Sequence, residues 1–326
     1  FKGGRISEDK FSNISNHLSD NDLLVFNNSR VIRARLKFIK ETGATIEILC
    51  LEPLTPFDYE HSFGSADPVE WKCIIGNLKK WKSGILTSSF SLKGKRYELF
   101  AEIRMPDGDA WRIRFRWNSK DISFGEVTDA VGHIPLPPYV KRDDENEDNI
   151  WYQTVYSTIK GSVAAPTAGL HFSTEVLDSI NTKGIRSVEL TMHIGAGTFK
   201  PVKVNDITKH EMHCEHFIIS KKVIETLLTY KGRIIAIGTT SVRTLESLYW
   251  LGLKIIQDPS FADSELFIEQ WEPYTKTTEV TMEESYKALL EFMKKRKTST
   301  LEGATKIMII PVYKFRVIDG MMTNFH

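Results

Sequence analysis

Cysteine is scarce in this sequence. Cys50, Cys73 and Cys214 are the only three among 326 residues, and they lie far apart. An odd number at such spacing provides neither a disulfide framework nor the paired cysteines of a zinc motif. The sequence therefore predicts a protein of a reducing compartment, and we expect a cytoplasmic location.

Long apolar runs and an excess of either charge are also missing. No run approaches the ~20 apolar residues that span a bilayer, so no membrane partner is expected. Lys and Arg number 43 against 42 Asp and Glu, for a formal net charge of +1. Any nucleic-acid contact must therefore come from a local patch. The opening FKGGRISEDKF lacks the regions of a signal peptide, and we expect both ends of the chain to be truncations.

The length predicts two domains, or one domain with an insertion. Between Arg33 and Val127 short strand patterns alternate with turn signals, which is typical of a small β-barrel. The strands expected there are Arg33–Ile39, Thr45–Leu51, Trp71–Ile75, Gly84–Phe90, Tyr97–Ile103 and Ala110–Trp117. After Trp151 strands alternate with helices. We therefore predict a multi-domain α/β fold: a layered α/β catalytic body over residues 1–32 and 128–326, with a small β-barrel domain inserted at 33–127.

The last of these strands alternates apolar with basic side chains. Its period of two places Arg112, Arg114 and Arg116 on one face. Such a ridge can follow a phosphate backbone, and we predict RNA contact there. A solvated outer barrel face would show the same pattern.

The stretch VAAPTAGLHF begins like a buried strand and then breaks into small residues. Pro166 fixes its own φ and Gly169 accepts a positive φ, so the turn is predicted to be rigid and open to a ligand. His171 follows, and Ser173 is a good N-cap for a helix that Gly184 ends. We interpret the stretch as a pocket floor; a structural turn is the alternative.

In DLLVFNNSRVIRARL, polar groups follow an apolar strand, Leu23–Phe26. Side chains at the end of such a strand bind ligands in layered α/β folds. Asn27, Asn28 and Arg30 are therefore candidates for substrate contact. A turn in which the asparagines bond their own backbone is the alternative.

In ELTMHIGAGTFKPV, His193 precedes a glycine-rich loop with Gly195, Gly197 and Thr198. The third glycine of a dinucleotide-binding loop is absent, because Lys200 stands in its place, and this excludes that motif. The histidine and the glycine-rich loop therefore predict a pocket, and a purely structural loop is the alternative.

The cluster HEMHCEHF is the densest group of ionisable residues. His210, His213 and His216 at a spacing of three would share one helix face. Zinc sites of known spacing need a further ligand group, so we predict no metal here. His213 and Glu215 are favoured as hydrogen-bonding or proton-transfer groups.

The stretch RIIAIGTTSVRTLES reads as a buried strand followed by the start of a helix. Free N–H groups there suit a carboxylate or a phosphate, although capping alone would explain the hydroxyls. The candidate binding residues are Gly238, Thr239, Thr240, Ser241 and Arg243. Glu246 is expected to pair with Arg243.

Three further features lie in the last part of the sequence. Glu283–Arg296 is predicted as an amphipathic helix whose apolar stripe is core. Lys306–Pro311 is predicted as a buried strand. Asp319 and Asn324 lie in a final polar loop.

Taken together, these stretches resemble the S-adenosylmethionine:tRNA ribosyltransferase-isomerase family of queuosine biosynthesis. The matching segments, in the order of the family, are DLLVFNNSRVIRARL, GSVAAPTAGLHF, ELTMHIGAGTFKPV, HEMHCEHF, IGTTSVRTLES and DGMMTNFH. Compared with the family, the chain lacks an opening segment and a helical tail.

The resemblance implies the two-domain fold given above and a reaction. The ribosyl part of S-adenosylmethionine moves to the aminomethyl group of 7-aminomethyl-7-deazaguanine at the tRNA wobble position and is isomerised, which gives epoxyqueuosine and releases adenine and methionine. S-adenosylmethionine is then a substrate, and no cofactor is expected. The partners are tRNA and S-adenosylmethionine, and the chain is expected to be a monomer.

We assign hypothetical roles on this basis. Proton transfer falls to His171, His193 or His213, with Glu215 as partner or alternative base. The helix start from Gly238 to Arg243 would hold the methionine carboxylate or a phosphate. The adenosine pocket would be lined by Pro166, Thr167, Gly169, Gly195, Gly197 and Thr198. Secondary substrate contacts are assigned to Asn27, Asn28, Arg30, Asp319 and Asn324.

Two other readings remain open from the sequence. A catalytically inactive tRNA-binding homologue would keep the same fold. A metal-dependent hydrolase would use the HEMHCEH cluster.

Overall fold

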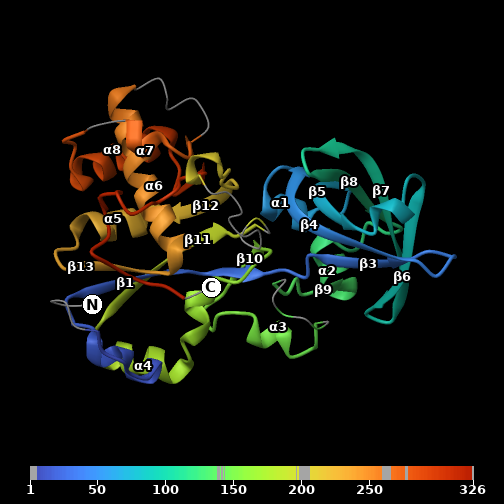
Figure 1. The fold of residues 1–326 in the computed structure, drawn as a ribbon, viewed down its shortest axis with the longest axis horizontal. Coiled ribbons are helices and arrows are strands. Elements are labelled where there is room, and N and C mark those ends of the chain that lie inside the picture. Colours follow the sequence, from blue (N-terminus) through green and yellow to red (C-terminus); the bar gives the residue numbers. More distant parts are fainter. Residues whose placement is uncertain are drawn as a thin grey trace.

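The computed structural model describes residues 6–137, 140, 142, 144–195, 197, 206–258, 266–275 and 278–324. Two sheets lie side by side along the longest axis of the molecule (Figure 1). Most of the helices surround the sheet that holds β1. We call the part built on that sheet the body, and we call the other sheet the curved sheet.

The sheet of the body has the strand order β14-β15-β12-β11-β1-β13-β16. β1 (Asp22–Asn27) lies at its centre and pairs in parallel with β11 (Arg186–His193) and β13 (Arg233–Ile237). β12 runs antiparallel to β11 and to β15. The remaining strands are β12 (Glu215–Ser220), β14 (Phe267–Ile268), β15 (Thr300–Thr305) and β16 (Gly320–Met322).

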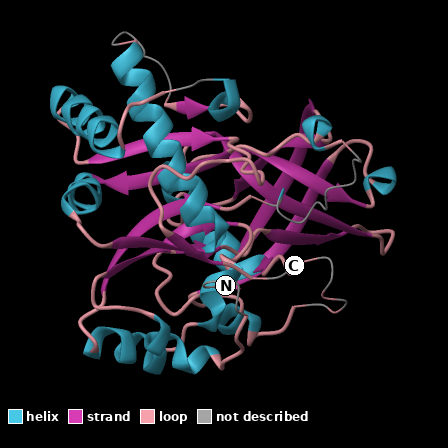
Figure 2. Ribbon diagram, turned by 60° about the vertical axis from the view of Figure 1, so that its left-hand side comes forward, coloured by secondary structure: helices cyan, strands magenta, loops and turns pink. Residues whose placement is uncertain are grey.

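Helices cover both faces of this sheet, which is why every residue of β1 is buried. Leu23 and Val25 point into a core with α6 and α8, whereas Leu24 and Phe26 point into a second core with α4. The longest helix, α6, crosses the strands (Figure 2). The helices of the body are α4 (Thr174–Thr182), α5 (Lys221–Thr229), α6 (Gly238–Gln257), α7 (Glu272–Thr275) and α8 (Met282–Arg296), with the 3₁₀ helices η1 (Phe11–His17), η3 (Thr167–His171) and η5 (Ile207–Lys209). Within the described part of the chain, no helix has the length and apolarity that crossing a membrane requires.

Two predicted helices are confirmed, the first of them together with its predicted end signals. The Ser173 side chain accepts a hydrogen bond from the N–H of Val176 at the start of α4, and Gly184, with φ of +72°, follows its last turn. α8 begins with a capping box between Thr281 and Glu284.

The curved sheet is antiparallel throughout, in the order β6-β7-β8-β5-β4-β3-β9. Its core contains Trp71, Phe115 and Phe124, the last from α2. Its elements are β3 (Arg35–Ile39), β4 (Thr45–Thr55), α1 (Tyr59–Gly64), β5 (Val69–Gly76), η2 (Leu78–Lys80), β6 (Ile85–Leu92), β7 (Lys95–Asp107), β8 (Ala110–Trp117), α2 (Phe124–Val131) and β9 (Gly132–His133). All six predicted strands of this region are present, and the mixed α/β fold with separate sheets is confirmed.

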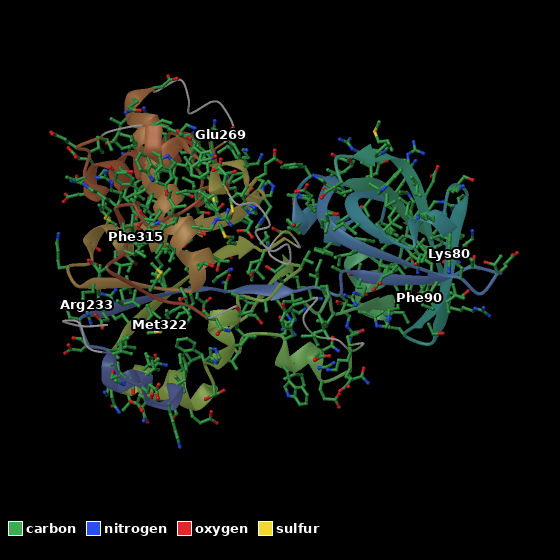
Figure 3. The ribbon with its side chains drawn as sticks, in the orientation of Figure 1. Lys80, Phe90, Arg233, Glu269, Phe315 and Met322 are labelled. Carbon is green, nitrogen blue, oxygen red and sulfur yellow. The ribbon has the colours of Figure 1, made fainter. Side chains whose placement is uncertain are left out.

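Two short strands connect the body with the curved sheet. β2 (Ser29–Val31) and β10 (Ile159–Ser162) pair in parallel between them (Figure 1). The chain leaves the body through β2 and returns through α3 (Asp148–Trp151) and β10. Lys80 lies at the end of the curved sheet that points away from the body (Figure 3). The domain limits at 32/33 and 127/128 stay a prediction.

Two other predictions about strands are wrong. The stretch Val163–Ala165 is buried, but β10 ends before it at Ser162 because the chain bends there. The stretch Lys306–Pro311 is not a strand either. β15 ends at Thr305, whose hydroxyl accepts a hydrogen bond from the N–H of Ile307 at 2.9 Å and so turns the chain out of the ladder.

Candidate active site

A cavity of about 990 Å³ lies between the body and the curved sheet. On the side of the body it is lined by the segments that follow β10, β11 and β13 and by the segment before β12. On the opposite side it is lined by residues of the curved sheet and α1. A shallower hollow of about 820 Å³ borders it and shares Glu211, Met212 and Lys306.

The parallel strands bring the predicted loops together. β11 and β13 flank β1 in the same direction, so the loops that follow them start at one edge of the sheet. Gly195 and Gly197 follow β11 and line the cavity, and Pro166 and Thr167 approach from the segment after β10. Thr198 lies outside the described residues.

The start of α6 forms part of the cavity wall. Gly238 has a φ of +84°, in the region that favours glycine, and Ile237 before it makes no side-chain cap. Gly238, Thr239 and Thr240 line the cavity. The backbone N–H groups of this turn and the helix dipole favour an anion there. Ser241 does not line the cavity, because its Oγ donates to the Ile237 carbonyl at 2.8 Å.

Behind the cavity, Glu215 joins two predicted residues. Its buried carboxylate accepts a hydrogen bond from the Arg243 guanidinium, and its Oε1 lies 3.0 Å from Nε2 of His213. Arg243 also donates to the carbonyl of Ile307 at 3.1 Å and to that of Thr305 at 3.3 Å. Of these residues, His213 reaches the cavity wall. The structure therefore presents a histidine that a buried ion pair holds in place.

The charge of Glu215 fixes the tautomer of His213. Burial alone would raise the pKa of Glu215, but the Arg243 guanidinium, the His213 hydrogen bond and the Gly195 N–H bring that pKa below its usual value. A carboxylate only accepts hydrogen bonds, so Nε2 of His213 must carry a proton. Nδ1 is then the atom that can exchange a proton with a ligand.

His193 is a second histidine in the cavity wall. Its ring stacks on Tyr59 of α1 with centroids 4.4 Å apart, and only 4% of the residue is exposed. A Cβ at Gly161 would collide with this ring, which explains the glycine there. Burial lowers the pKa of His193 to about 4, and His216 contributes, so the imidazole is neutral at pH 7. Within the described residues its Nδ1 has no hydrogen-bond partner.

The structure does not bring His171 to the cavity, where a proton-transfer role was predicted for it. The residue ends η3, is exposed, and packs against Phe11 with ring centroids 5.4 Å apart. Gly169 is also outside the lining, because it packs against the Tyr156 hydroxyl, where a Cβ would collide.

Most of the secondary candidates also lie elsewhere. Asn27 holds two strands together: its side chain donates to the Met192 carbonyl and accepts from the Met192 N–H, both at 3.0 Å. Asn28, Arg30 and Asp319 are not among the cavity residues, whereas Asn324 is.

The predicted arginine face exists on β8, where the burial pattern alternates. Arg112 pairs with Asp107 at 3.0 Å, and the Arg116 guanidinium lies 4.1 Å from the centre of the Phe100 ring. Arg114 is exposed. These residues are not part of the cavity wall, and RNA contact through them stays a prediction.

The shared helix face predicted for HEMHCEHF is wrong. Residues 210–214 are not helical, and β12 begins at Glu215 because His216 and Phe217 pair with His193 and Met192 of β11. In the described part of the chain, no three His, Cys, Asp or Glu side chains gather as metal ligands would.

The expected pair between Arg243 and Glu246 is wrong as well. Glu246 is buried and accepts a hydrogen bond from the Tyr313 hydroxyl at 2.7 Å and from the N–H groups of Arg316, Val317 and Ile318. It therefore anchors the segment before β16.

Sequence reasoning missed the wall that the curved sheet supplies. Tyr59, Glu52 and Lys72 line the cavity, with Oε1 of Glu52 3.0 Å from Nζ of Lys72. The strand pattern predicted β4 and β5 but not what they face. One local signal for α1 was present: Asp58 caps the helix by accepting from the N–H of His61.

The amino-acid sequence matches one family over nearly its whole length. The profile described as queuosine biosynthesis protein matches residues 2–326. The chain belongs to that family.

Its relatives are named more specifically. A protein of Francisella philomiragia and one of Francisella tularensis subsp. novicida, both named S-adenosylmethionine:tRNA ribosyltransferase-isomerase, are each 36% identical over 326 residues, which is 99% of this chain and 77% of each relative. The crystal structure of an S-adenosylmethionine tRNA ribosyltransferase from Thermotoga maritima is 23% identical, with 100% of this chain and 74% of that chain covered and a TM-score of 0.36.

Proposed function

We propose that this chain transfers the ribosyl group of S-adenosylmethionine to 7-aminomethyl-7-deazaguanine at the tRNA wobble position and isomerises it, giving epoxyqueuosine and releasing adenine and methionine. Family membership and the names of the Francisella relatives support this function. The observation that carries it is one cavity with an anion-binding helix start on one side and an ion-pair-held histidine on another. No observation favours the inactive homologue or the hydrolase.

S-adenosylmethionine fits the side of the cavity that the body supplies. The methionine carboxylate takes the N–H groups at the start of α6, beside Gly238, Thr239 and Thr240. Lys306, which also lines the cavity, adds positive charge. The small residues of the segments after β10 and β11 leave room for the adenosine.

The reaction needs a base for the proton made acidic by the sulfonium and an acid for the departing adenine. His213 supplies proton transfer through Nδ1, with Glu215 and Arg243 as positioning residues behind it. His193 stays neutral at pH 7 and offers a polar ring at the cavity wall. Adenine would leave from between these two histidines.

The remaining expectations follow from this function. We infer that the curved sheet is the inserted β-barrel domain, since β3 and β6 approach each other. We infer that the chain acts as a monomer in the cytoplasm, that tRNA and S-adenosylmethionine are its partners, and that it needs no cofactor beyond these substrates.

Free adenine is the direct readout of the proposal. The protein is mixed with S-adenosylmethionine and tRNA that carries the deazaguanine precursor, and adenine is measured by chromatography. Adenine release that requires both substrates is the expected result. Salt-sensitive tRNA binding without adenine release would instead support the binding-only homologue.

A further inference from the structure

The wall of the cavity formed by the curved sheet differs chemically from the side formed by the body. Glu52 and Asp109 bring carboxylates to this wall, together with the ammonium group of Lys72 and the ring of Tyr59. The opposite side carries the start of α6 and the uncharged His193. An anionic group therefore fits the side of the cavity formed by the body, and a cationic group fits the side formed by the curved sheet.

Glu52 is the carboxylate whose surroundings the structure defines best. Lys72 occupies its Oε1 at 3.0 Å, and in the described residues its Oε2 has no protein partner. Its side chain is 30% exposed. Burial and then the negative charge of Glu52 raise the pKa of both Tyr59 and Cys214, that of Cys214 to about 11. The charge of Glu52 therefore affects the pKa of Tyr59, in the part of the chain that holds the curved sheet, and that of Cys214 in the body.

The exposure of the wall residues separates the cavity floor from its mouth. His193 and Thr240 are 4% and 8% exposed, whereas the side chains of Glu52 and Lys72 are 30% and 29% exposed. A small ligand can fill the buried floor before a large one arrives. A base that stays attached to an RNA chain has to enter where the wall is open to solvent, and Glu52 lies on that part of the wall together with the exposed residues Asp109 and Thr239.

We propose that Glu52 binds the primary ammonium group of the aminomethyl substituent on the RNA base and so determines specificity for the modified base. This inference rests on the proposed function. Lys72 holds one carboxylate oxygen in place, and the substrate ammonium binds the other in a charge-assisted hydrogen bond. A guanine at the same RNA position has no ammonium to offer.

The test compares two anticodon stem-loops that differ at the wobble position, one with 7-aminomethyl-7-deazaguanine and one with guanine. The wild-type protein is expected to bind the first more tightly. Glu52→Gln should reduce that preference roughly 10- to 100-fold, the size expected for a hydrogen bond between charged groups. Glu52→Asp, which keeps the charge, should keep part of the preference.

Glu47→Gln is the matched control. Glu47 lies on the same strand, β4, pairs with Arg35 at 3.0 Å and is 38% exposed, but it is not in the cavity wall. This variant should keep the full preference for the modified base. Equal preference in Glu52→Gln and the wild type would overturn the inference.

The affinity for S-adenosylmethionine, measured by calorimetry, distinguishes the two cations that Glu52 could bind. It should be unchanged in Glu52→Gln. A loss of that affinity with the base preference intact would overturn the inference, because Glu52 would then bind the sulfonium or the amino group of S-adenosylmethionine. Absence of adenine release by the wild type would count against the proposed function itself, which separates the two failures.

Discussion

His213 and His171 differ in the contacts that hold their side chains. His213 lines the cavity and is bonded to buried Glu215, whereas His171 is exposed beside Phe11. We expect His213→Ala to lower kcat for adenine release by roughly 10²- to 10⁴-fold, the usual range for a proton-transfer group. His171→Ala should keep wild-type turnover. Equal effects of the two substitutions would contradict this assignment.

His193 makes the stability of the protein depend on pH. Its pKa in the folded state, about 4, lies below its ordinary value of 6.5. The stabilisation is therefore fully present above pH 6.5 and is lost as pH falls toward 4, because only the unfolded state takes up the proton readily. Between pH 7 and 4.5 the wild type should lose about 2 to 3 kcal/mol of unfolding free energy more than His193→Gln does. Urea unfolding of both proteins at several pH values measures this; parallel curves would exclude it.

The start of α6 can be tested by one substitution. Gly238→Ala places a side chain at a φ of +84°, which costs about 1 to 2 kcal/mol, while its new methyl group would make only ordinary contacts with Thr240 and Ala168. Tilting this turn should weaken S-adenosylmethionine binding by up to roughly tenfold in calorimetry.

Gly184→Ala is the control for that experiment. Gly184 has a similar φ of +72°, nothing within 4 Å of an added Cβ, and no place in the cavity wall. It should lose similar stability and keep the affinity for S-adenosylmethionine. The same loss of affinity in both variants would mean that α6 acts through stability alone.

Helices and strands whose ends are decided by neighbouring residues were predictable from the sequence. Ser173 and Gly184 mark the ends of α4 because capping and a positive φ are decided by neighbouring residues. The segment around His213 was misjudged because a spacing of three suits a helix, while its pairing with β11 depends on residues far away in the chain. Glu52 and Tyr59 were missed for the same reason: no local pattern says which strand or helix will face the loops of the body.

The net charge of +1 gives the protein no general attraction for tRNA. If the face of β8 contacts the RNA backbone, Arg114→Gln and Arg116→Gln should each reduce the slope of log affinity against log salt by about 1. Lys287→Gln is a suitable control, because Lys287 is exposed on α8 of the body and pairs with Glu283 at 2.6 Å. Slopes unchanged in both arginine variants would place the RNA elsewhere.

The position of β1 sets the order in which a growing chain can acquire structure. Leu23 pairs with Arg186 and Ile234, which the ribosome adds much later, whereas the strands of the curved sheet find their partners between Arg35 and His133. Folding during synthesis therefore completes the curved sheet first. Until β11 and β13 emerge, the apolar segment LLVF of β1 stays exposed and open to chaperones or to aggregation. Ligands bind only after that interval, so they stabilise the finished protein and give no help to the nascent one.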